Sequence, residues 1–304
     1  MPVLNTIFPL FALLVLGSLL KRTGLTNDAF LATCDRLVYY IFFPAMLFWK
    51  LGSASAGEEF SPGLCAAGAA GVGMIFLFCL WALRFFRIDS FKAGSFVQAG
   101  VRFNTYIGMA IVLNTLGEEG ARHFGILAGI VIPIINVMVV SVLIWHSSQD
   151  LSPGKKRRYF VKALVSNPLI LACVLGLLYS RTGLGFPVFM VNTFSLITAV
   201  TLPLALISIG GTLSVKGLAA HARLSLFAAF IKLVLLPVTG FFWLKLFHVT
   251  GIPFKTGMIF FCLPTSTALY VLSAQLNSDT DLASAAIMAS TLLSFVSLSL
   301  ALIL

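Results

Sequence analysis

A polar cluster interrupts an apolar stretch of the sequence at residues 100–106, where it contains Arg102, Asn104, Thr105 and Tyr106. A guanidinium inside such a stretch is costly in lipid, and it normally faces a cavity or a partner. Because guanidinium groups bind carboxylates through paired hydrogen bonds, Arg102 is predicted to hold an anion. The alternative is that its long side chain reaches back to the membrane surface.

A second polar cluster follows in the last third of the chain, where Pro264 precedes Thr265, Ser266 and Thr267. Proline lacks a backbone donor and disfavours a helical conformation in the residue before it, so a helix should end here. The hydroxyls would then open a new half-helix beside freed backbone groups. The alternative is a simple kink, with the hydroxyls bonded back to their own helix.

Matched residues place the two clusters in equivalent segments, because Phe91-Lys92-Ala93-Gly94 aligns with Phe254-Lys255-Thr256-Gly257 and brings Asn104 opposite Thr267. Asn136 follows a proline and could direct its amide inward, although a hydrogen bond between helices is the commoner role of such a residue. The predicted substrate-binding set is therefore Arg102, Asn104, Thr105, Tyr106, Asn136, Pro264, Thr265, Ser266 and Thr267. Lys232 also lies deep in an apolar segment, with a role in the site or a side chain that reaches the surface as the two alternatives.

The amino-acid composition indicates the class of protein in which these clusters lie. The chain has 304 residues, of which 59% are hydrophobic and 10% charged, and its mean hydropathy is +1.03. A soluble domain carries about 25% charged residues, and apolar runs of about twenty residues fit helices across a bilayer. The predicted class is an all-α polytopic membrane protein with ten transmembrane helices, near residues 4–20, 29–49, 62–84, 94–115, 121–146, 163–180, 187–211, 223–246, 255–275 and 281–303.

An internal repeat indicates how these helices are organised. Arg22-Thr23-Gly24-Leu25 returns as Arg181-Thr182-Gly183-Leu184, and at the same offset the apolar segment around Pro44 matches the one around Pro203. The basic residues 148–162 separate a first repeat, residues 1–147, from a second, residues 163–304. Because five helices per repeat is an odd number, the second repeat should be inserted upside down. The sequence therefore predicts two inverted repeats whose fourth and ninth helices are broken and cross.

Basic residues predict the orientation. The loops that join helices 1–2, 3–4, 5–6 and 7–8 carry twelve Lys and Arg residues, against five on the opposite side. The positive-inside rule places the richer side in the cytoplasm and both termini outside. The net charge of +10 is largely explained by this bias, so no nucleic-acid partner is predicted.

Three segments carry a resemblance to a known family. Residues 103–108, residues 202–211 and Leu263-Pro264-Thr265-Ser266-Thr267 resemble the auxin efflux carrier family, which includes plant auxin exporters and bacterial permeases for malonate and related carboxylates. A more distant similarity is to bile acid:sodium symporters. The resemblance implies a scaffold of helices 1, 2, 6 and 7, and an elevator-like transport domain of helices 3–5 and 8–10. It also implies a homodimer through helices 2 and 7. Where plant members have a proline at the helix 4 crossing, this chain has Val101.

These arguments predict a secondary transporter of a small organic anion in the bacterial inner membrane, with the substrate at the crossing of helices 4 and 9. The alternatives are a sodium-coupled symporter of the bile-acid type, a channel or sensor, and a membrane-embedded enzyme. No histidine spacing suits a metal and no nucleophile motif is present, so neither a catalytic residue nor a cofactor is expected. Asp35 is the one acid within a predicted helix, and the sequence does not decide between H⁺ and Na⁺ as a coupling ion.

Overall fold

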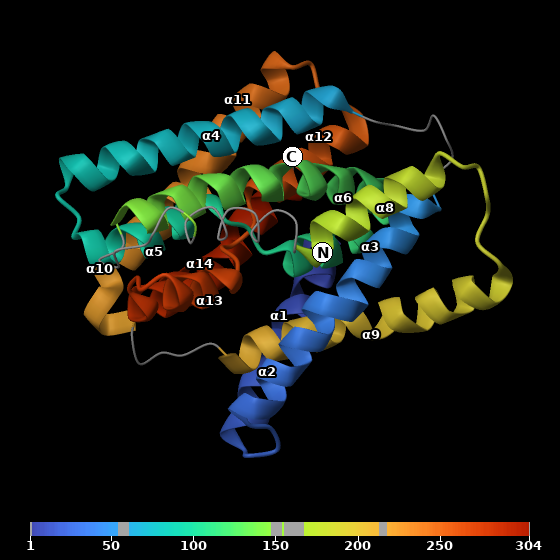
Figure 1. Cartoon of the computed structure of the whole chain (residues 1–304), viewed down its shortest axis with the longest axis horizontal. Helices are drawn as coiled ribbons and strands as arrows, with labels where there is room; N and C mark the ends of the chain where they lie inside the picture. The colour runs from blue at the N-terminus through green and yellow to red at the C-terminus, as the bar shows by residue number, and fades with distance from the viewer. Residues whose placement is uncertain (1, 54–60, 147–153, 155–166, 213–217, 304) are drawn as a thin grey trace.

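The computed structural model describes residues 2–53, 61–146, 154, 167–212 and 218–303. The described part of the chain is helical and contains no β-strand (Figure 1). Its elements are α1 (Pro2–Arg22), α2 (Asp28–Leu37), η1 (Val38–Phe42), α3 (Phe43–Gly52), α4 (Pro62–Phe85), α5 (Ser90–Val101), α6 (Thr105–His146), α8 (Pro168–Ser180), α9 (Val188–Thr212), α10 (Leu218–Phe230), η2 (Ile231–Leu235), α11 (Leu236–Leu246), α12 (Gly251–Phe261), α13 (Ala268–Gln275) and α14 (Thr280–Ala301).

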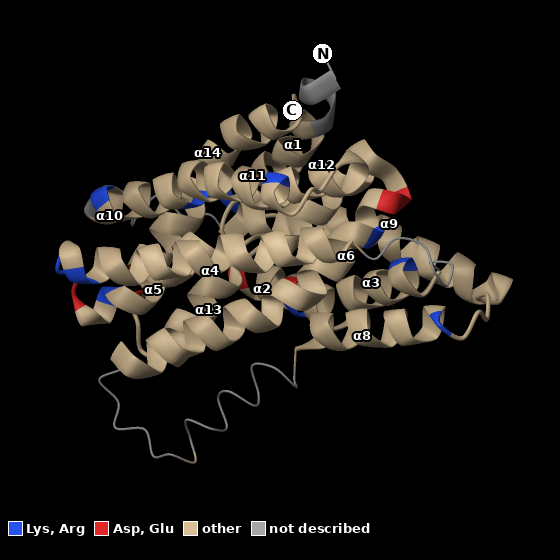
Figure 2. Cartoon of the chain, turned by 90° about the horizontal axis from the view of Figure 1, so that it is seen from above, with Lys and Arg blue, Asp and Glu red and all other residues tan. Residues whose placement is uncertain are grey.

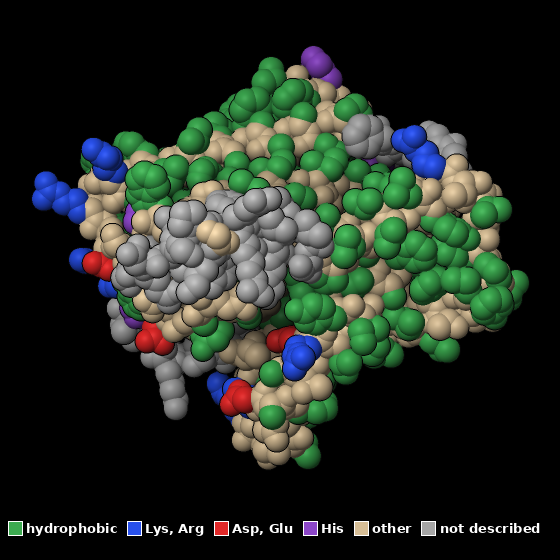
Figure 3. Space-filling view, viewed as in Figure 1, with side chains coloured by type: hydrophobic (Ala, Val, Ile, Leu, Met, Phe, Trp, Pro, Cys, Tyr) green, Lys and Arg blue, Asp and Glu red, His purple; other side chains and the backbone are tan. Residues whose placement is uncertain are grey.

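Six helical segments are long and apolar enough to cross a membrane: Asp28–Gly52, Pro62–Phe85, Ser90–His146, Val188–Thr212, His221–Leu246 and Thr280–Ala301. Most of the charged residues lie toward the ends of the helices in Figure 2. Hydrophobic side chains cover much of the face in Figure 3. Because a helix satisfies its own backbone hydrogen bonds, such apolar helices are stable in lipid. The helical structure and the six apolar segments confirm the prediction of an all-α polytopic membrane protein.

The helix limits follow from local sequence signals. Asn27, Asp89 and Asp279 each accept a hydrogen bond from a backbone N–H in the first turn of α2, α5 and α14, as N-cap residues do. Pro62 and Pro168 occupy the first turn of their helices, where the missing N–H has no helical partner to lose. The expected linker at residues 148–162 lies outside the described residues, apart from Gly154.

The repeated Arg-Thr-Gly motif forms the same turn twice. Gly24 after α1 and Gly183 after α8 have φ angles of 78° and 68°, a left-handed conformation that glycine adopts without a steric penalty. In each turn the threonine hydroxyl donates to a carbonyl at the end of the helix. The duplication seen in the sequence therefore encodes a shared helix-ending turn.

Two π-turns occur where proline enters a long helix. Val38–Phe42 precedes Pro44 in α3, and Ile231–Leu235 precedes Pro237 in α11. Since proline cannot donate to the carbonyl four residues earlier, a locally wider turn lets the helix continue past it. A third irregularity lies within α6, where Gly117 has φ 65° and ψ −153°. The chain changes direction there, close to the expected boundary between the fourth and fifth predicted helices.

The helices pack mainly in two groups. The first group contains α1, α2, α3, α8 and α9, and the second contains α4, α5, α10, α11, α12, α13 and α14, while α6 packs against members of both. Within the first group α1 and α9 cross closely: a Cβ added to Gly17 would lie 1.9 Å from the Ile207 carbonyl oxygen, and one added to Gly210 would lie 1.9 Å from that of Leu14. Small residues permit this approach of two backbones, as at many helix contacts in membranes.

Candidate anion site at two helix interruptions

Two helical series are interrupted, and the interruptions touch. The backbone is non-helical at residues 102–104, between α5 and α6, and again between the end of α12 at Phe261 and the start of α13 at Ala268. The N–H of Asn104 donates to the carbonyl oxygen of Pro264 over 2.9 Å. This bond fixes the two non-helical segments side by side in the middle of the bundle.

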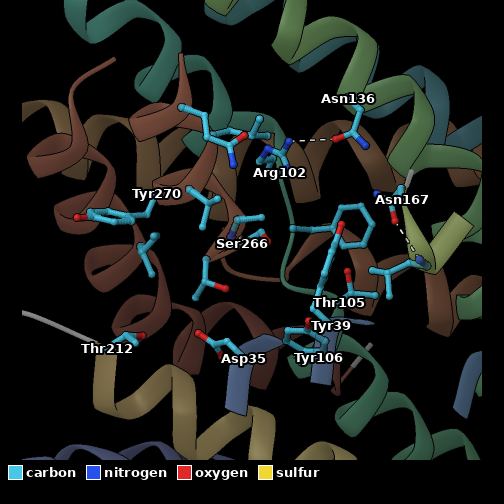
Figure 4. Close-up of a pocket in the computed structure, with 18 of the residues that line it drawn as sticks. Asp35, Tyr39, Arg102, Thr105, Tyr106, Asn136, Asn167, Thr212, Ser266 and Tyr270 are labelled. Carbon is cyan, nitrogen blue, oxygen red and sulfur yellow. Dashed lines mark hydrogen bonds between the residues drawn. The ribbon is translucent and has the colours of Figure 1, made fainter. Parts of the chain in front are cut away.

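Arg102 is the charged residue of the first interruption, and only 8% of its surface is exposed. Its Nε donates to Oε1 of Gln98 over 3.1 Å, and its Nη2 donates to Oδ1 of Asn136 over 3.0 Å (Figure 4). Both partners are neutral amides, so they orient the guanidinium without cancelling its charge. Among the described residues, no acidic side chain forms an ion pair with Arg102. The Arg102 side chain is enclosed in the helix bundle and lines a cavity.

Asn104 ends the first interruption by capping the next helix. Its Oδ1 accepts hydrogen bonds from the N–H groups of Tyr106 and Ile107, each over 3.1 Å, and the residue is 2% exposed. The first N–H groups of a helix have no partner within the helix, so a capping side chain stabilises its start. Asn104 therefore holds the start of α6 beside Arg102.

The second interruption is supported by hydroxyls from α14. Ser290 accepts a hydrogen bond from the N–H of Thr265 over 3.2 Å, and Ser297 donates to the carbonyl oxygen of Cys262 over 2.9 Å. The hydroxyl of Ser266 accepts from the N–H of Ala268 over 3.3 Å. The Thr265 side chain is fully buried, and its Oγ1 has no hydrogen-bond partner. The backbone groups freed near Pro264 are thus bonded to a neighbouring helix.

A cavity of about 920 Å³ lies beside these interruptions. Six of the nine predicted substrate-binding residues line it: Arg102, Thr105, Tyr106, Asn136, Ser266 and Thr267. Asn104, Pro264 and Thr265 are not among the lining residues, and their contacts instead build the wall of the cavity. The nine predicted residues therefore lie close together, six in the lining of one cavity and three in the segments that support it.

The cavity also has walls that the sequence analysis did not include in the site. Asp35 and Tyr39 come from α2 and η1, Asn167 from the start of α8, and Tyr270 from α13. Asp35 lies across the view from Arg102 in Figure 4. One signal was present in the sequence: Asp35 is the one acid within a predicted helix, and Tyr39 stands four residues later, on the same helix face.

Several residues that line the cavity lie at helix ends. Lys21, Asp28, Thr212, Gln275 and Asp281 line it, and they lie at or near the ends of α1, α2, α9, α13 and α14. According to the charge distribution in the sequence, these ends share the side that is predicted to be cytoplasmic. The cavity is therefore bordered by the helix ends of one side, and it reaches inward as far as Arg102.

One cluster near this rim has side chains of the kinds that bind metals. Ligand atoms of His221, Asp279 and Asp281 lie within 4.8 Å of one another. Asp279 already caps α14 through Oδ1, and its Oδ2 lies 3.9 Å from Nδ1 of His221. The geometry suits an ion pair between α10 and α14 when the histidine is protonated, and this cluster alone does not define a metal site.

Comparison with known proteins indicates which proteins this chain resembles. Residues 154–302 match the family described as "Membrane transport protein". An "Uncharacterized transporter" of Methanothermobacter thermautotrophicus is 26% identical over 97% of this chain and 96% of its own length. The "Putative malonate transporter" of Rhizobium meliloti is 24% identical over 95% of this chain and 91% of its own length. The resemblance to transporters found in the sequence motifs is confirmed, and the chain is an integral membrane protein similar to membrane transport proteins.

Proposed function

We propose that this protein is a secondary carrier of small organic anions, that it works by elevator-type alternating access, and that the anion binds beside the two helix interruptions. The observation that carries the proposal is the Arg102 guanidinium. It lines a cavity of about 920 Å³ and is held by two neutral amides. A positive charge at the wall of a cavity in a largely apolar protein favours a negatively charged ligand.

The surroundings of Arg102 suit a carboxylate. Thr105 stands at the start of α6 and Thr267 directly before α13, and both line the cavity. The N-terminal end of a helix carries a partial positive charge, which favours an anion nearby. Hydroxyls and an amide are also present to bind carboxylate oxygens. The name of the Rhizobium meliloti relative supports malonate as the first carboxylate to test.

The packing of the helices supports a carrier. The second helix group together with α6 holds both interruptions, while α2, α8 and α9 of the first group, with η1, form the opposite wall of the cavity. A ligand between two such groups is exposed to one side of the membrane at a time when one group moves against the other. In this proposal the group containing α1, α2, α3, α8 and α9 is the scaffold. In the proposed orientation the cavity opens to the cytoplasmic side, and each of the two groups combines helices of both inverted repeats.

The direct test uses the purified protein in proteoliposomes preloaded with unlabelled malonate, with entry of labelled malonate as the measurement. A carrier gives counterflow that saturates with substrate concentration, whereas a channel gives neither. Changing Arg102 to Ala removes charge-assisted hydrogen bonds, each of which contributes about 1.5–3 kcal/mol, so malonate affinity should fall roughly tenfold to a hundredfold. The matched control is Arg84→Ala, an exposed arginine near the end of α4.

Three results would contradict the proposal. Wild-type protein that gives no counterflow with malonate, with other small carboxylates or with indole acids would show that it is not a carrier of this class. An Arg102→Ala variant with wild-type affinity and rate would move the binding site elsewhere. Flux that rises without saturation would favour a channel.

A further inference from the structure

A second buried cation lies behind the wall of the cavity. Lys232 belongs to η2, the π-turn between α10 and α11. Its side chain is 0% exposed, and its Nζ has no hydrogen-bond partner. An unpartnered ammonium in a protein interior is strongly unfavourable. A buried lysine of this kind is stabilised in its charged form when a negatively charged group lies nearby during part of the transport cycle.

The position of Lys232 connects it to both interruptions. Lys232 lies near Cys262, the residue that directly follows α12 at the second interruption. The η2 turn also packs against α5, which ends at the first interruption, and against α14. Lys232 is not among the residues that line the cavity. Lys232 therefore does not contact a ligand in the cavity, and it can act on one only through its charge.

The helices around these two cations contain almost no acid to balance them. No Asp or Glu occurs in α4, α5, α10, η2, α11, α12 or α13. In α14 the one acid is Asp281, at the rim beside His221. The acids of α6, Glu118 and Glu119, follow its Gly117 turn, and Glu118 is paired with Lys50. Arg102 at the end of α5 and Lys232 in η2 are thus two buried basic side chains, and among the described residues neither forms an ion pair with a carboxylate.

Electrostatic attraction acts over several ångströms in an interior of low dielectric constant, so a ligand beside Arg102 is also influenced by Lys232. A ligand with one negative charge compensates one cation, and a ligand with two negative charges compensates both. We propose that Lys232 is a specificity-determining charge, which makes the site at Arg102 prefer small dicarboxylates, as dianions, over monocarboxylates. This inference rests on the proposed function and defines its substrate class.

The test compares two probes that differ by one charge, malonate and its monomethyl ester, in binding to the full-length protein in detergent. Wild-type protein should bind malonate roughly tenfold more tightly than the ester, a difference of about 1.4 kcal/mol in binding free energy. Changing Lys232 to Met should remove most of this preference by weakening the binding of malonate, while the ester changes little. Lys245→Met is the matched control, an exposed lysine that follows on the same helical series.

A second variant cancels the charge without removing the lysine. Changing Cys262 to Asp places a carboxylate next to the ammonium, and the preference for malonate should fall as it does in Lys232→Met. Changing Cys262 to Asn introduces a side chain of nearly the same shape without a charge, and it should preserve the preference. This pair also provides the answer if Lys232→Met does not fold.

The outcomes separate this inference from the proposed function. If wild-type protein binds malonate no better than the ester, or if a folded Lys232→Met or Cys262→Asp variant keeps the wild-type preference, the role of Lys232 is refuted and the carrier proposal stands. If wild-type protein binds and transports neither malonate nor the ester nor any other organic anion, the proposed function fails and this inference fails with it.

Discussion

The two helix interruptions solve the same structural problem in different ways. The first, at residues 102–104, contains no proline and is completed by the side chain of Asn104, which caps α6 two residues after Arg102. The second contains Pro264 and depends on another helix, because Ser290 and Ser297 of α14 bond to its backbone. The first interruption is therefore supported from within its own segment, and the second from outside.

The first interruption therefore supplies the positive charge at the cavity, and the second supplies polar groups that support the cavity wall. The first interruption places a cation at the cavity, and its residues are adjacent in sequence. The second contributes hydroxyls and a carbonyl oxygen that receives the Asn104 N–H. We infer that ligand affinity depends mainly on the first interruption, whereas the shape of the cavity depends on both.

The largest expected effect is on affinity at the first interruption. Changing Arg102 to Lys keeps the charge but loses the planar fork that bonds to Gln98 and Asn136. We expect malonate affinity to fall roughly tenfold, whereas Ser266→Ala at the second interruption should change it by less than about threefold. Saturation curves of malonate counterflow measure both. Equal effects of the two substitutions would contradict the division between charge and support.

The next effect concerns the stability of the second interruption. Changing Ser290 to Ala leaves the N–H of Thr265 buried without an acceptor, which costs about 1–3 kcal/mol. The melting temperature in detergent should fall. Ser299→Ala is the control, since this hydroxyl bonds only to the Phe295 carbonyl of its own helix. A Ser290→Ala variant as stable as the control would show that α14 does not support this segment.

A smaller loss of stability is expected at the first interruption. Changing Asn104 to Ala removes the cap of α6 and costs about 1 kcal/mol. Asn114→Ala, an exposed position on the same helix, should leave the melting temperature unchanged. Malonate affinity should fall with Asn104→Ala as well, because the backbone that positions Arg102, two residues earlier, is held less firmly. An unchanged melting temperature would refute the role of Asn104 as a cap.

The smallest effect is expected for Pro264→Ala. The carbonyl oxygen that accepts the Asn104 N–H is retained, so the contact between the interruptions survives. The main loss is the restriction that proline imposes on the unfolded chain, about 0.4–1 kcal/mol. Thermal unfolding of the variant measures it. A loss larger than that of Ser290→Ala would mean that proline itself, and not α14, maintains the interruption.

The sequence was sufficient to predict both interruptions, because each has a local signal: a proline followed by hydroxyls, and an arginine in an apolar run. The shared turn at Gly24 and Gly183 was visible as a repeated motif for the same reason. The wall formed by Asp35 and Tyr39 was not predicted as part of the site, since it depends on packing between helices distant in sequence. The difference between Arg102, which lines the cavity, and Lys232, which does not, also depends on packing between distant helices. Both lysine and arginine side chains could have reached the surface, and only tertiary packing decides that Lys232 is enclosed.

The central claim, that an anion binds beside Arg102, is tested most directly by locating a dicarboxylate in the protein. Bromomalonate carries a bromine atom whose anomalous scattering marks its position in a crystal. The account predicts a bromine peak in the cavity between Arg102 and Thr267, and loss of this peak in the Arg102→Ala variant. A peak elsewhere in the bundle, or an unchanged peak in the variant, would contradict it.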